Sequence, residues 1–557
     1  MEFLGKLTAF FTSVLAFLLA PLISIFPCSN DYTFDIDTSV TSEALPNAVS
    51  NINIWNAKSS KEFYNPKVSD TNNIFEFVEY VQLMQCTGGA VDRDLFKDPL
   101  DFDTLDDYDF SSLIESCRGI LKLGAKPHLK MGSVPLKYSA LARTDTTFGT
   151  NPYPPDDYDV YYDYIYAIGE ALVNEFGREE VLSWRFGVMT EYENKDWFFT
   201  ADESPESSAA AFCKLYDYTV DALQKSIGEE IFVGAHSMTV TEGLWDERIF
   251  IEHCGKGTNY KTGKTGSRIC FLSSSFYDRK PGEFTSGKTV PECMAYLQDC
   301  AKDAGLTGLI FGFDEGRIYG GLTSGKDDSQ LLSRTVGYTY QAAYDARLYT
   351  QLINAGGDYF SSWDYLSNGL FDGNPTVSYH VAKNIAKFKG MNKAETVKTK
   401  KGLLIESDID CLSATGEDGS VLLMAYNFKN DIEYSNSTDL TFNINAPQLD
   451  GKDVEVKIYR IDDSCNYFDE WVEDRKAYGI TDSCFGWSPD CPVIENYNNL
   501  RDENARNIYF SGLKDKYAKC SVLTPETVNM TVENGTITLT ETVAANAVVF
   551  VEINPVD

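Results

Sequence analysis

Between about residues 50 and 385, short apolar runs alternate with longer amphipathic segments, and this alternation constrains the fold more than any other feature of the chain. Short apolar runs bounded by turn signals predict buried strands, and the amphipathic segments between them predict helices. Strands and helices that alternate in this way form a parallel sheet. There are eight such runs, which is the number of strands that closes a (β/α)8 TIM barrel.

The expected strands lie near Ile52–Trp55, Tyr80–Met84, Lys126–Met131, Ser183–Met189, Ile231–Ala235, Ile269–Ser274, Gly308–Phe313 and Asp358–Trp363. Helices are expected between them, among others at Asp109–Leu123, Asp157–Phe176, Ser208–Ser226, Val290–Ala304 and Ser333–Asn354. In a barrel of this kind the active site forms at the C-terminal ends of the strands.

Two of the strands end in an acidic residue: Glu191 follows the fourth and Glu315 follows the seventh. Paired carboxyl groups at strand ends suit glycoside cleavage. One delivers a proton to the leaving oxygen, and the other stays ionised to attack the anomeric carbon or to activate a water. Each has an acidic neighbour as a rival. Glu193 is the rival of Glu191, but it lies beyond the end of the strand. Asp314 is the rival of Glu315, and alternation along a strand is expected to turn only one of these two side chains inward. A surface ion-pair partner is the ordinary alternative for any of the 83 acidic residues.

Composition excludes several classes of function. The formal net charge of -35 argues against a nucleic-acid partner, because the chain could not replace the counterions around phosphates. Four widely spaced histidines and the lack of a Cys-x-x-Cys pair predict no metal site. No glycine-rich phosphate loop follows a strand, which argues against a nucleotide cofactor. We therefore expect no cofactor.

The N-terminal segment, residues 1–30, predicts export. Lys6 precedes an apolar stretch from Leu7 to Phe26, which is typical of a secretory signal, and an uncleaved membrane anchor is the alternative. Either interpretation predicts a secreted or cell-surface protein. A membrane partner is expected only through such an anchor.

A chain of 557 residues is too long for one core. We assign 31–390 to the barrel, and expect 391–557 to form a β-sandwich because short alternating strands follow Gly390. The segment 31–50 could lend this sandwich a strand. Within it, 461–519 has the composition of a long loop insertion, and four cysteines there could form disulfides whose pairing the sequence leaves open: Cys465, Cys484, Cys491 and Cys520.

Several segments between about residues 75 and 390 resemble glycoside hydrolase family 39, the β-xylosidase and α-L-iduronidase group. They occur in the order of the family's strands: Leu121–Met131, Tyr153–Tyr158 followed by Gly177–Phe186, Phe271–Tyr277, Tyr359–Trp363, and Asn374-Pro375 with Tyr379-His380. The resemblance implies a barrel with two catalytic carboxylates. Glu191 then falls on the acid/base and Glu315 on the nucleophile.

The resemblance also implies substrate-binding roles at the mouth of the barrel. Tyr277 would hydrogen-bond the nucleophile, and Trp363 would form a platform under the sugar. A core tyrosine and a filler of the barrel mouth are the ordinary alternatives. His236 follows the fifth strand and could contact a sugar hydroxyl or be a buried, satisfied histidine.

Three positions depart from the family pattern. Thr190 stands where the family has an Asn, which precedes the acid/base and binds the 2-hydroxyl of the sugar. Ser275 stands where the family has a His, and Lys130 where it has a Glu. We place all three among the substrate-binding residues and expect an altered substrate.

The resulting prediction is a retaining glycoside hydrolase that acts on polysaccharides or oligosaccharides, with a xylosidase-like activity as the first expectation. Three other specificities remain open on the same scaffold: an arabinosidase, a glucosidase or an endo-acting hydrolase. A carbohydrate-binding barrel without turnover is the alternative from a different class.

Overall fold

The computed structural model describes residues 30–56, 74–278, 287–318, 338–363, 375–402, 406–484 and 502–556. The N-terminal segment with its predicted signal or anchor lies outside these ranges. No helix in the described part of the chain combines the length and apolarity that crossing a bilayer requires.

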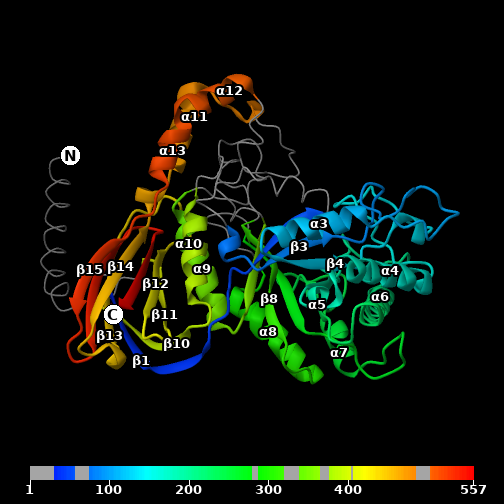
Figure 1. Ribbon diagram of the computed structural model, residues 1–557, viewed down its shortest axis with the longest axis horizontal. Coiled ribbons are helices and arrows are strands. Elements are labelled where there is room, and N and C mark those ends of the chain that lie inside the picture. Colours follow the sequence, from blue (N-terminus) through cyan, green and yellow to red (C-terminus); the bar gives the residue numbers. More distant parts are fainter. Residues whose placement is uncertain are drawn as a thin grey trace, which may run out of the picture.

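Eight parallel strands close into a barrel, and a nine-stranded sheet forms a second domain beside it (Figure 1), which confirms the predicted fold class. The barrel strands are β2 (Asn51–Asn56), β3 (Tyr80–Gln85), β4 (Lys126–Met131), β5 (Arg185–Val188), β6 (Phe232–Ser237), β7 (Phe271–Asp278), β8 (Ile310–Ile318) and β9 (Tyr359–Trp363). All eight coincide with the apolar runs in the sequence to within a few residues.

Helices surround the barrel and begin where the sequence provides caps. The Asp157 side chain accepts hydrogen bonds from the first turn of α4, and Thr289 and Glu292 form a capping box on α8. The helices are α3 (Ser111–Lys122), α4 (Tyr158–Phe176), α5 (Arg178–Leu182), α6 (Pro205–Ser226), α7 (Arg248–Lys256), α8 (Val290–Ala304), α9 (Tyr340–Asn354) and α10 (Val377–Ile385). Short 3-10 turns lie at η1 (Ile74–Glu76), η2 (Leu136–Tyr138) and η5 (Ala386–Phe388).

Many apolar residues of the strands face the helices, whereas polar side chains of β2, β3 and β4 reach Asp314 inside the barrel. Ile52, Val81 and Leu129 belong to the large core between strands and helices. Lys130 on β4 contacts Asp314 on β8, and these strands lie on opposite sides of the closed barrel, so the contact crosses its interior. This barrel therefore carries buried charge directly beneath the ends of its strands.

The second domain is a sheet folded into two layers. Its strand order is β15-β14-β17-β12-β11-β10-β1-β13-β16, and side chains from both halves of this order share one hydrophobic cluster. The strands are β1 (Tyr32–Ala44), β10 (Asn392–Lys400), β11 (Asp408–Thr415), β12 (Val421–Phe428), β13 (Thr438–Asn445), β14 (Asp453–Ile461), β15 (Glu526–Thr531), β16 (Thr536–Val543) and β17 (Val548–Pro555). The N-terminal β1 pairs with β10 and β13, so it belongs to this sheet.

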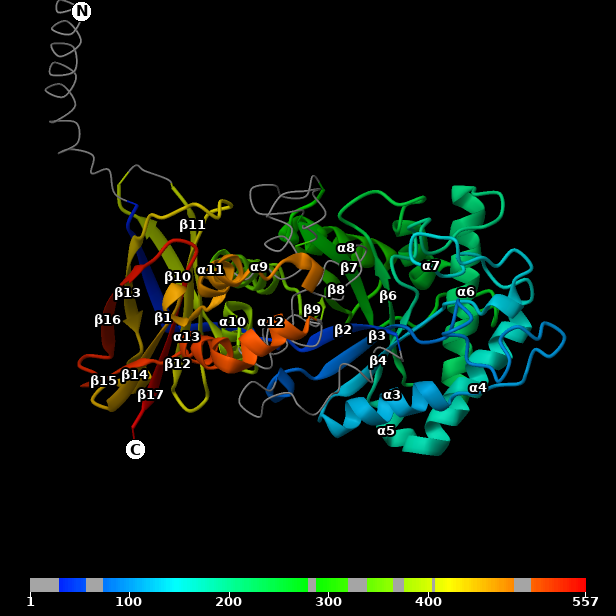
Figure 2. The same cartoon turned by 90° about the horizontal axis from the view of Figure 1, so that it is seen from above.

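Helices α9 and α10 lie between the barrel and the sheet, as Figures 1 and 2 both show. Strand β12 is buried on both faces because its alternate residues join different cores. Leu423 faces the core of the sandwich, whereas Phe428 packs against Tyr340 and Tyr344 of α9, with ring centroids 5.5 and 6.2 Å away. The sandwich thus supports the barrel on the side of its last two helices.

The expected loop insertion at 461–519 is helical in its described part, so that expectation is wrong. A small aromatic core that includes Tyr467, Trp471 and Tyr517 holds the helices together, and the many polar residues around it concealed this core in the sequence. Its elements are η7 (Asp463–Cys465), α11 (Phe468–Tyr478), η8 (Asp482–Cys484), α12 (Glu503–Ile508), the π-helical η9 (Tyr509–Leu513) and α13 (Lys514–Cys520), and η6 (Pro447–Leu449) precedes them.

The disulfides that the sequence allowed in this insertion are not formed among its described cysteines. Cys465, Cys484 and Cys520 are free thiols, and Cys491 lies outside the described residues. Cys484 and Cys520 pack against the aromatic core of the insertion. These thiols therefore contribute as small apolar side chains.

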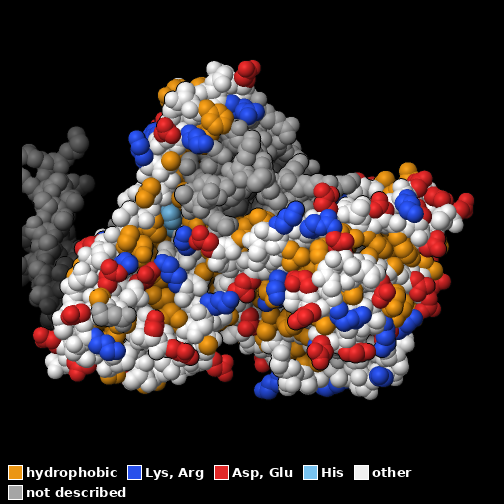
Figure 3. Space-filling view, in the orientation of Figure 1, with side chains coloured by type: hydrophobic (Ala, Val, Ile, Leu, Met, Phe, Trp, Pro, Cys, Tyr) orange, Lys and Arg blue, Asp and Glu red, His pale blue; other side chains and the backbone are white. Residues whose placement is uncertain are grey.

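Acidic side chains are spread over both domains on the face shown in Figure 3, where lysine and arginine side chains lie between them. This face has no continuous basic stripe, in keeping with the net charge of -35.

Candidate active site

Glu191 lies in the loop directly after β5, and the backbone of this loop is strained. Met189 and Glu191 have φ angles of 64° and 43°, in the left-handed region that non-glycine residues rarely adopt. The loop is fixed between two neighbouring strands, because the Met189 amide donates to the Met131 carbonyl of β4 and the Tyr192 amide donates to the His236 carbonyl of β6. Such strain persists only where the surroundings enforce it. Here the surroundings place the Glu191 carboxyl group over the barrel.

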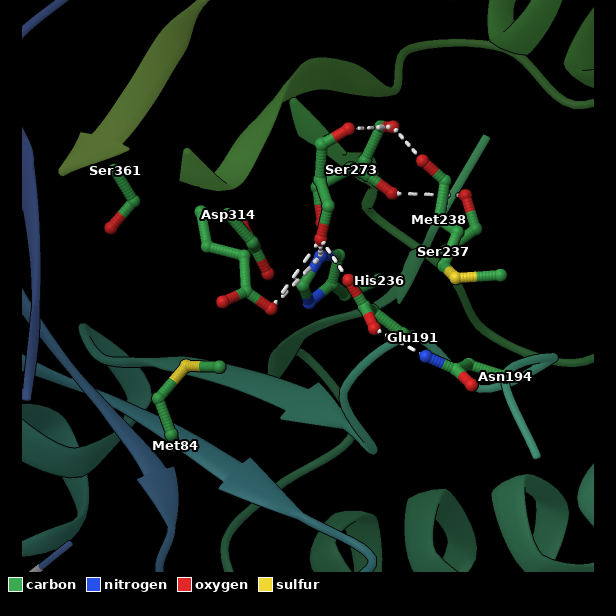
Figure 4. Close-up of polar contacts among 12 residues, drawn as sticks. Met84, Glu191, Asn194, His236, Ser237, Met238, Ser273, Asp314 and Ser361 are labelled. Atoms are coloured by element: carbon green, nitrogen blue, oxygen red, sulfur yellow. Dashed lines mark hydrogen bonds and ion pairs between the residues drawn. The ribbon is translucent and has the colours of Figure 1, made fainter. Parts of the chain in front are cut away.

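Ser275 and Asn194 donate hydrogen bonds to this carboxyl group. The Ser275 hydroxyl lies 2.6 Å from Oε1, and the Asn194 amide nitrogen lies 2.8 Å from Oε2. In Figure 4 the Glu191 carboxylate lies between Asn194 and the ring of His236. Burial raises the pKa of Glu191, while the hydrogen bonds from Ser275, Asn194 and Trp197 oppose this rise. A raised pKa is what a proton donor at neutral pH requires.

A β-bulge places both Asp314 and Glu315 on the inner side of β8. In the pairing with β7, Ser274 lies opposite Phe313 but Ser275 lies opposite Glu315, so Asp314 is an extra residue in its strand. The alternation expected from the sequence, which turned only one of the two acids inward, is therefore wrong. The two acids nevertheless have different surroundings.

Asp314 lies in the barrel interior within a closed set of partners. It forms an ion pair with Lys130, and the Tyr359 hydroxyl donates to its other oxygen at 2.6 Å. Burial by itself would raise the pKa of Asp314, but the Lys130 ammonium lowers it below its usual value. Lys130 and Asp314 are fully buried. The structure thus places Lys130 in an internal ion pair, fully buried. The resemblance to family 39 had predicted a substrate contact at this position.

Glu315 receives its hydrogen bonds from the strand next to it. The Tyr277 hydroxyl donates to its Oε2 at 2.9 Å, and the Ser275 hydroxyl lies 3.4 Å from its Oε1. Tyr277 therefore occupies the position expected of it beside the candidate nucleophile. Ser275, which the sequence suggested only as a substrate contact, lies between the two carboxylates.

His236 lies beneath these groups and is fully buried. Its Nε2 is 2.8 Å from the Ser275 hydroxyl and 3.9 Å from Oε1 of Glu315. Burial, reinforced by the Lys130 charge, lowers the pKa of His236 well below 6.5, so the ring is neutral. The histidine therefore contacts the network between the carboxylates, and a direct contact with a sugar hydroxyl would require it to become accessible.

Glu191, His236 and Glu315 each have one oxygen or nitrogen atom that could bind a metal ion, and these three atoms lie within 4.8 Å of one another. A divalent cation uses similar spacings. However, the His236 nitrogen and the Glu191 carboxylate are already joined through the Ser275 hydroxyl, so the hydrogen bonds account for the arrangement.

Thr190 and Glu193 flank the acid/base candidate and are both buried. The Thr190 hydroxyl has no hydrogen-bond partner among the described residues, so it could serve a ligand. The Glu193 carboxylate accepts from the Met238 amide at 2.5 Å, and burial raises its pKa well above the usual value. Glu193 thus anchors the loop after β6. Trp363 ends β9, and its side chain lies outside what the structure describes.

Two neighbours of the carboxylates went unrecognised in the sequence. Asn194 contacts Glu191 from the same loop, and Trp197 lowers the pKa of Glu191 while stacking on Phe148, with ring centroids 4.1 Å apart. The only sequence signal was their position a few residues after Glu191.

A profile of the glycosyl hydrolases family 39 matches residues 95–473, which is more than half of the chain. The chain belongs to this family. The match confirms the resemblance to this family that the sequence indicated.

Curated relatives of this family 39 protein match it over part of its length. A β-xylosidase of Caldicellulosiruptor saccharolyticus is 24% identical over 176 residues, which make up 32% of this chain and 32% of that enzyme. The chain thus aligns with about a third of this curated relative.

Solved structures match nearly the whole of the family 39 chain. A monomeric β-xylosidase from Caulobacter crescentus CB15 has a TM-score of 0.64 at 15% identity, covering 94% of this chain and 100% of that one. The family 39 enzyme from Xanthomonas axonopodis pv. citri has a TM-score of 0.65 at 12% identity and covers 96% and 99%. At these identities the comparison shows a shared fold.

Proposed function

We propose that this family 39 chain is a retaining glycoside hydrolase in which Glu315 is the nucleophile and Glu191 is the acid/base. The observation that carries the proposal is the closeness of the two groups, since an oxygen of Glu191 lies within 4.8 Å of an oxygen of Glu315. Retaining enzymes hold their carboxyl groups about 5–5.5 Å apart, whereas inverting enzymes need about 6.5–9.5 Å to admit a water. A single hydroxyl, that of Ser275, reaches both carboxylates, which also favours the shorter separation.

In the first step a carboxylate oxygen of Glu315 attacks the anomeric carbon, and the bond from this carbon to the leaving oxygen breaks. Glu191 gives its proton to that oxygen. The surroundings suit this division of roles. Burial raises the pKa of Glu191, which favours the protonated form that a proton donor needs. Tyr277 donates a hydrogen bond to Glu315, which favours the charged nucleophile.

In the second step Glu191, now ionised, takes a proton from a water molecule whose oxygen bonds to the anomeric carbon. The ester bond to Glu315 breaks and returns its carboxylate. Two displacements at one carbon restore the original configuration. The Asn194 and Ser275 donors support the negative charge that Glu191 carries between the steps.

A xylosidase-like activity is the first candidate, because the curated relatives that match this chain are named β-xylosidases. Thr190 supports a modified specificity within this scheme. Its buried, unpartnered hydroxyl stands where the family pattern has an amide, so it offers one donor to a sugar hydroxyl. An arabinosidase, a glucosidase and an endo-acting enzyme remain competing specificities.

A panel of 4-nitrophenyl glycosides that differ in the sugar tests the proposal. Release of nitrophenol shows turnover and the preferred glycone, and proton NMR of the first anomer formed shows the stereochemical course. We expect the anomer to keep the configuration of the substrate. Inversion would contradict the retaining mechanism. Binding to xylo-oligosaccharides with no release from any aryl glycoside would instead indicate a carbohydrate-binding barrel.

A further inference from the structure

Ser275 contacts both candidate catalytic carboxylates and a buried histidine at once. Its hydroxyl oxygen lies 2.6 Å from Oε1 of Glu191, 3.4 Å from Oε1 of Glu315 and 2.8 Å from Nε2 of His236. A serine hydroxyl has one proton to donate and two lone pairs that accept. The two carboxylates therefore compete for one proton, and the histidine decides whether that proton is available to them.

The tautomer of His236 follows from its surroundings. The ring is neutral and carries one N–H group, since burial lowers its pKa well below 6.5. Nδ1 is buried with no hydrogen-bond partner among the described residues. A buried N–H without an acceptor is costly, so the proton belongs on Nε2, which can donate to the Ser275 oxygen. The serine proton is then free for a carboxylate.

Each carboxylate also has a donor of its own. Tyr277 donates to Glu315 and Asn194 donates to Glu191, so Ser275 is the shared donor. Rotation about the Ser275 Cβ–Oγ bond moves its proton from one acceptor to the other, while the oxygen keeps its bond from His236. Moving this proton therefore requires no movement of the backbone.

We propose that Ser275 is a positioning residue whose hydroxyl donates to whichever catalytic carboxylate bears the negative charge. This rests on the proposed retaining mechanism. Before attack the charge is on Glu315, and in the glycosyl-enzyme intermediate it is on Glu191. The same proton thus supports the nucleophile in the first step and the base in the second.

Other charged or titratable groups act on Glu191, and all of them except Glu315, which the test changes deliberately, stay constant in a test of this proposal. They come from the loop after β5 and from β4, β6 and β8, and they are Glu193, Asp196, Lys130, His236 and Glu315.

The test is a double-mutant cycle on the titration of Glu191, which needs no turnover. The protein is labelled with 13C at the glutamate carboxyl carbons, and the Glu191 signal is assigned from its loss in Glu191→Gln. Its titration midpoint is measured in the wild type, Ser275→Ala, Glu315→Gln and the double variant. Glu315→Gln mimics the intermediate, because it makes the nucleophile neutral.

Ser275→Ala should raise the Glu191 midpoint, because the ionised form loses a donor. The rise should be larger in the Glu315→Gln background, where no second anion competes for the hydroxyl. Equal rises in the two backgrounds would show that the proton is not shared, and no rise in either would remove the role altogether. Both results would overturn the proposal.

Two further variants control for structural effects. Ser274→Ala, on the same strand, loses a buried hydroxyl that donates to the Met238 carbonyl at 2.7 Å, and it should leave the Glu191 midpoint unchanged. Ser275→Cys has a similar shape but a weak donor, so its midpoint should lie between those of serine and alanine. The glycoside panel is a separate test: inactivity there would contradict the proposed function and leave the result of the cycle intact.

Discussion

Replacing Lys130 with methionine should destabilise the barrel strongly, because Asp314 would keep its charge in the interior without its cation. Both side chains are fully buried and form an ion pair. Removal of one partner from a buried pair costs about 3–5 kcal/mol. Methionine retains most of the apolar stem of lysine, so the cavity left behind is small and we expect a loss of about 4 kcal/mol.

This loss of unfolding free energy can be converted into a decrease in melting temperature. Unfolding entropy near 60 °C is about 2.1 cal/mol/K per residue, which is about 0.7 kcal/mol/K for a unit the size of this barrel. A loss of about 4 kcal/mol then lowers Tm by about 6 °C. Differential scanning calorimetry at pH 7 measures this shift.

The double variant Lys130→Met/Asp314→Asn is the matched control. It buries no unpaired charge, and the Tyr359 hydroxyl can still donate to the amide oxygen, so it should recover most of the lost stability. A loss below about 1 kcal/mol in Lys130→Met, or a double variant no more stable than the single one, would refute this reasoning.

The same variant should respond to pH in a defined direction. In the wild type Lys130 lowers the pKa of Asp314, so the stability from the pair is present above the unfolded-state pKa and is lost as pH falls through the lower folded-state pKa. Without Lys130, burial dominates and the pKa of Asp314 rises. The folded variant then binds a proton as pH falls, and its deficit relative to the wild type should be smaller at pH 5 than at pH 8. A deficit independent of pH would contradict this assignment.

Two predictions concern the carboxylates and a third concerns Thr190, and each is checked with the aryl glycoside panel. Glu315→Gln should lower kcat at least about a thousandfold, while Asp314→Asn should reduce activity mainly through stability. If Asp314→Asn were the inactive variant, the nucleophile assignment would be wrong. Glu191→Ala should lose about 10²–10⁴-fold on poor leaving groups and far less on activated ones, with azide accelerating the second step. Thr190→Asn should raise kcat on xylosides if the amide restores a hydrogen bond to the sugar 2-hydroxyl. No change in activity on any sugar would show that Thr190 does not face the substrate.

The barrel was predictable because its signal is repeated along the chain. Each strand needs an apolar face against the helices, and each predicted run, such as Lys126–Met131 or Ile269–Ser274, contributes apolar residues to that face. The register of those runs also brought Glu191 and Glu315 to the same end of the barrel. Their catalytic roles stay predictions until the variants are assayed.

The interior of the site was not predictable in the same way. A single extra residue at Asp314 changes which side chains face inward, and no pattern in one strand reveals a bulge that depends on pairing with its neighbour. Lys130 and Asp314 are 184 positions apart, so their ion pair depends on the closed barrel. The helical insertion was missed for a similar reason, because Tyr467, Trp471 and Tyr517 form a core only after the helices meet.

Trapping of the covalent intermediate tests the central claim most directly. A 2,4-dinitrophenyl 2-deoxy-2-fluoro glycoside of the preferred sugar should form an intermediate that breaks down slowly, since the fluorine removes the 2-hydroxyl contact that strengthens in the transition state. After proteolysis, mass spectrometry should find one sugar attached to Glu315. Attachment of the sugar to Asp314 would show that Asp314, and not Glu315, is the nucleophile. Rapid hydrolysis to the inverted anomer with no labelled peptide would contradict the retaining mechanism.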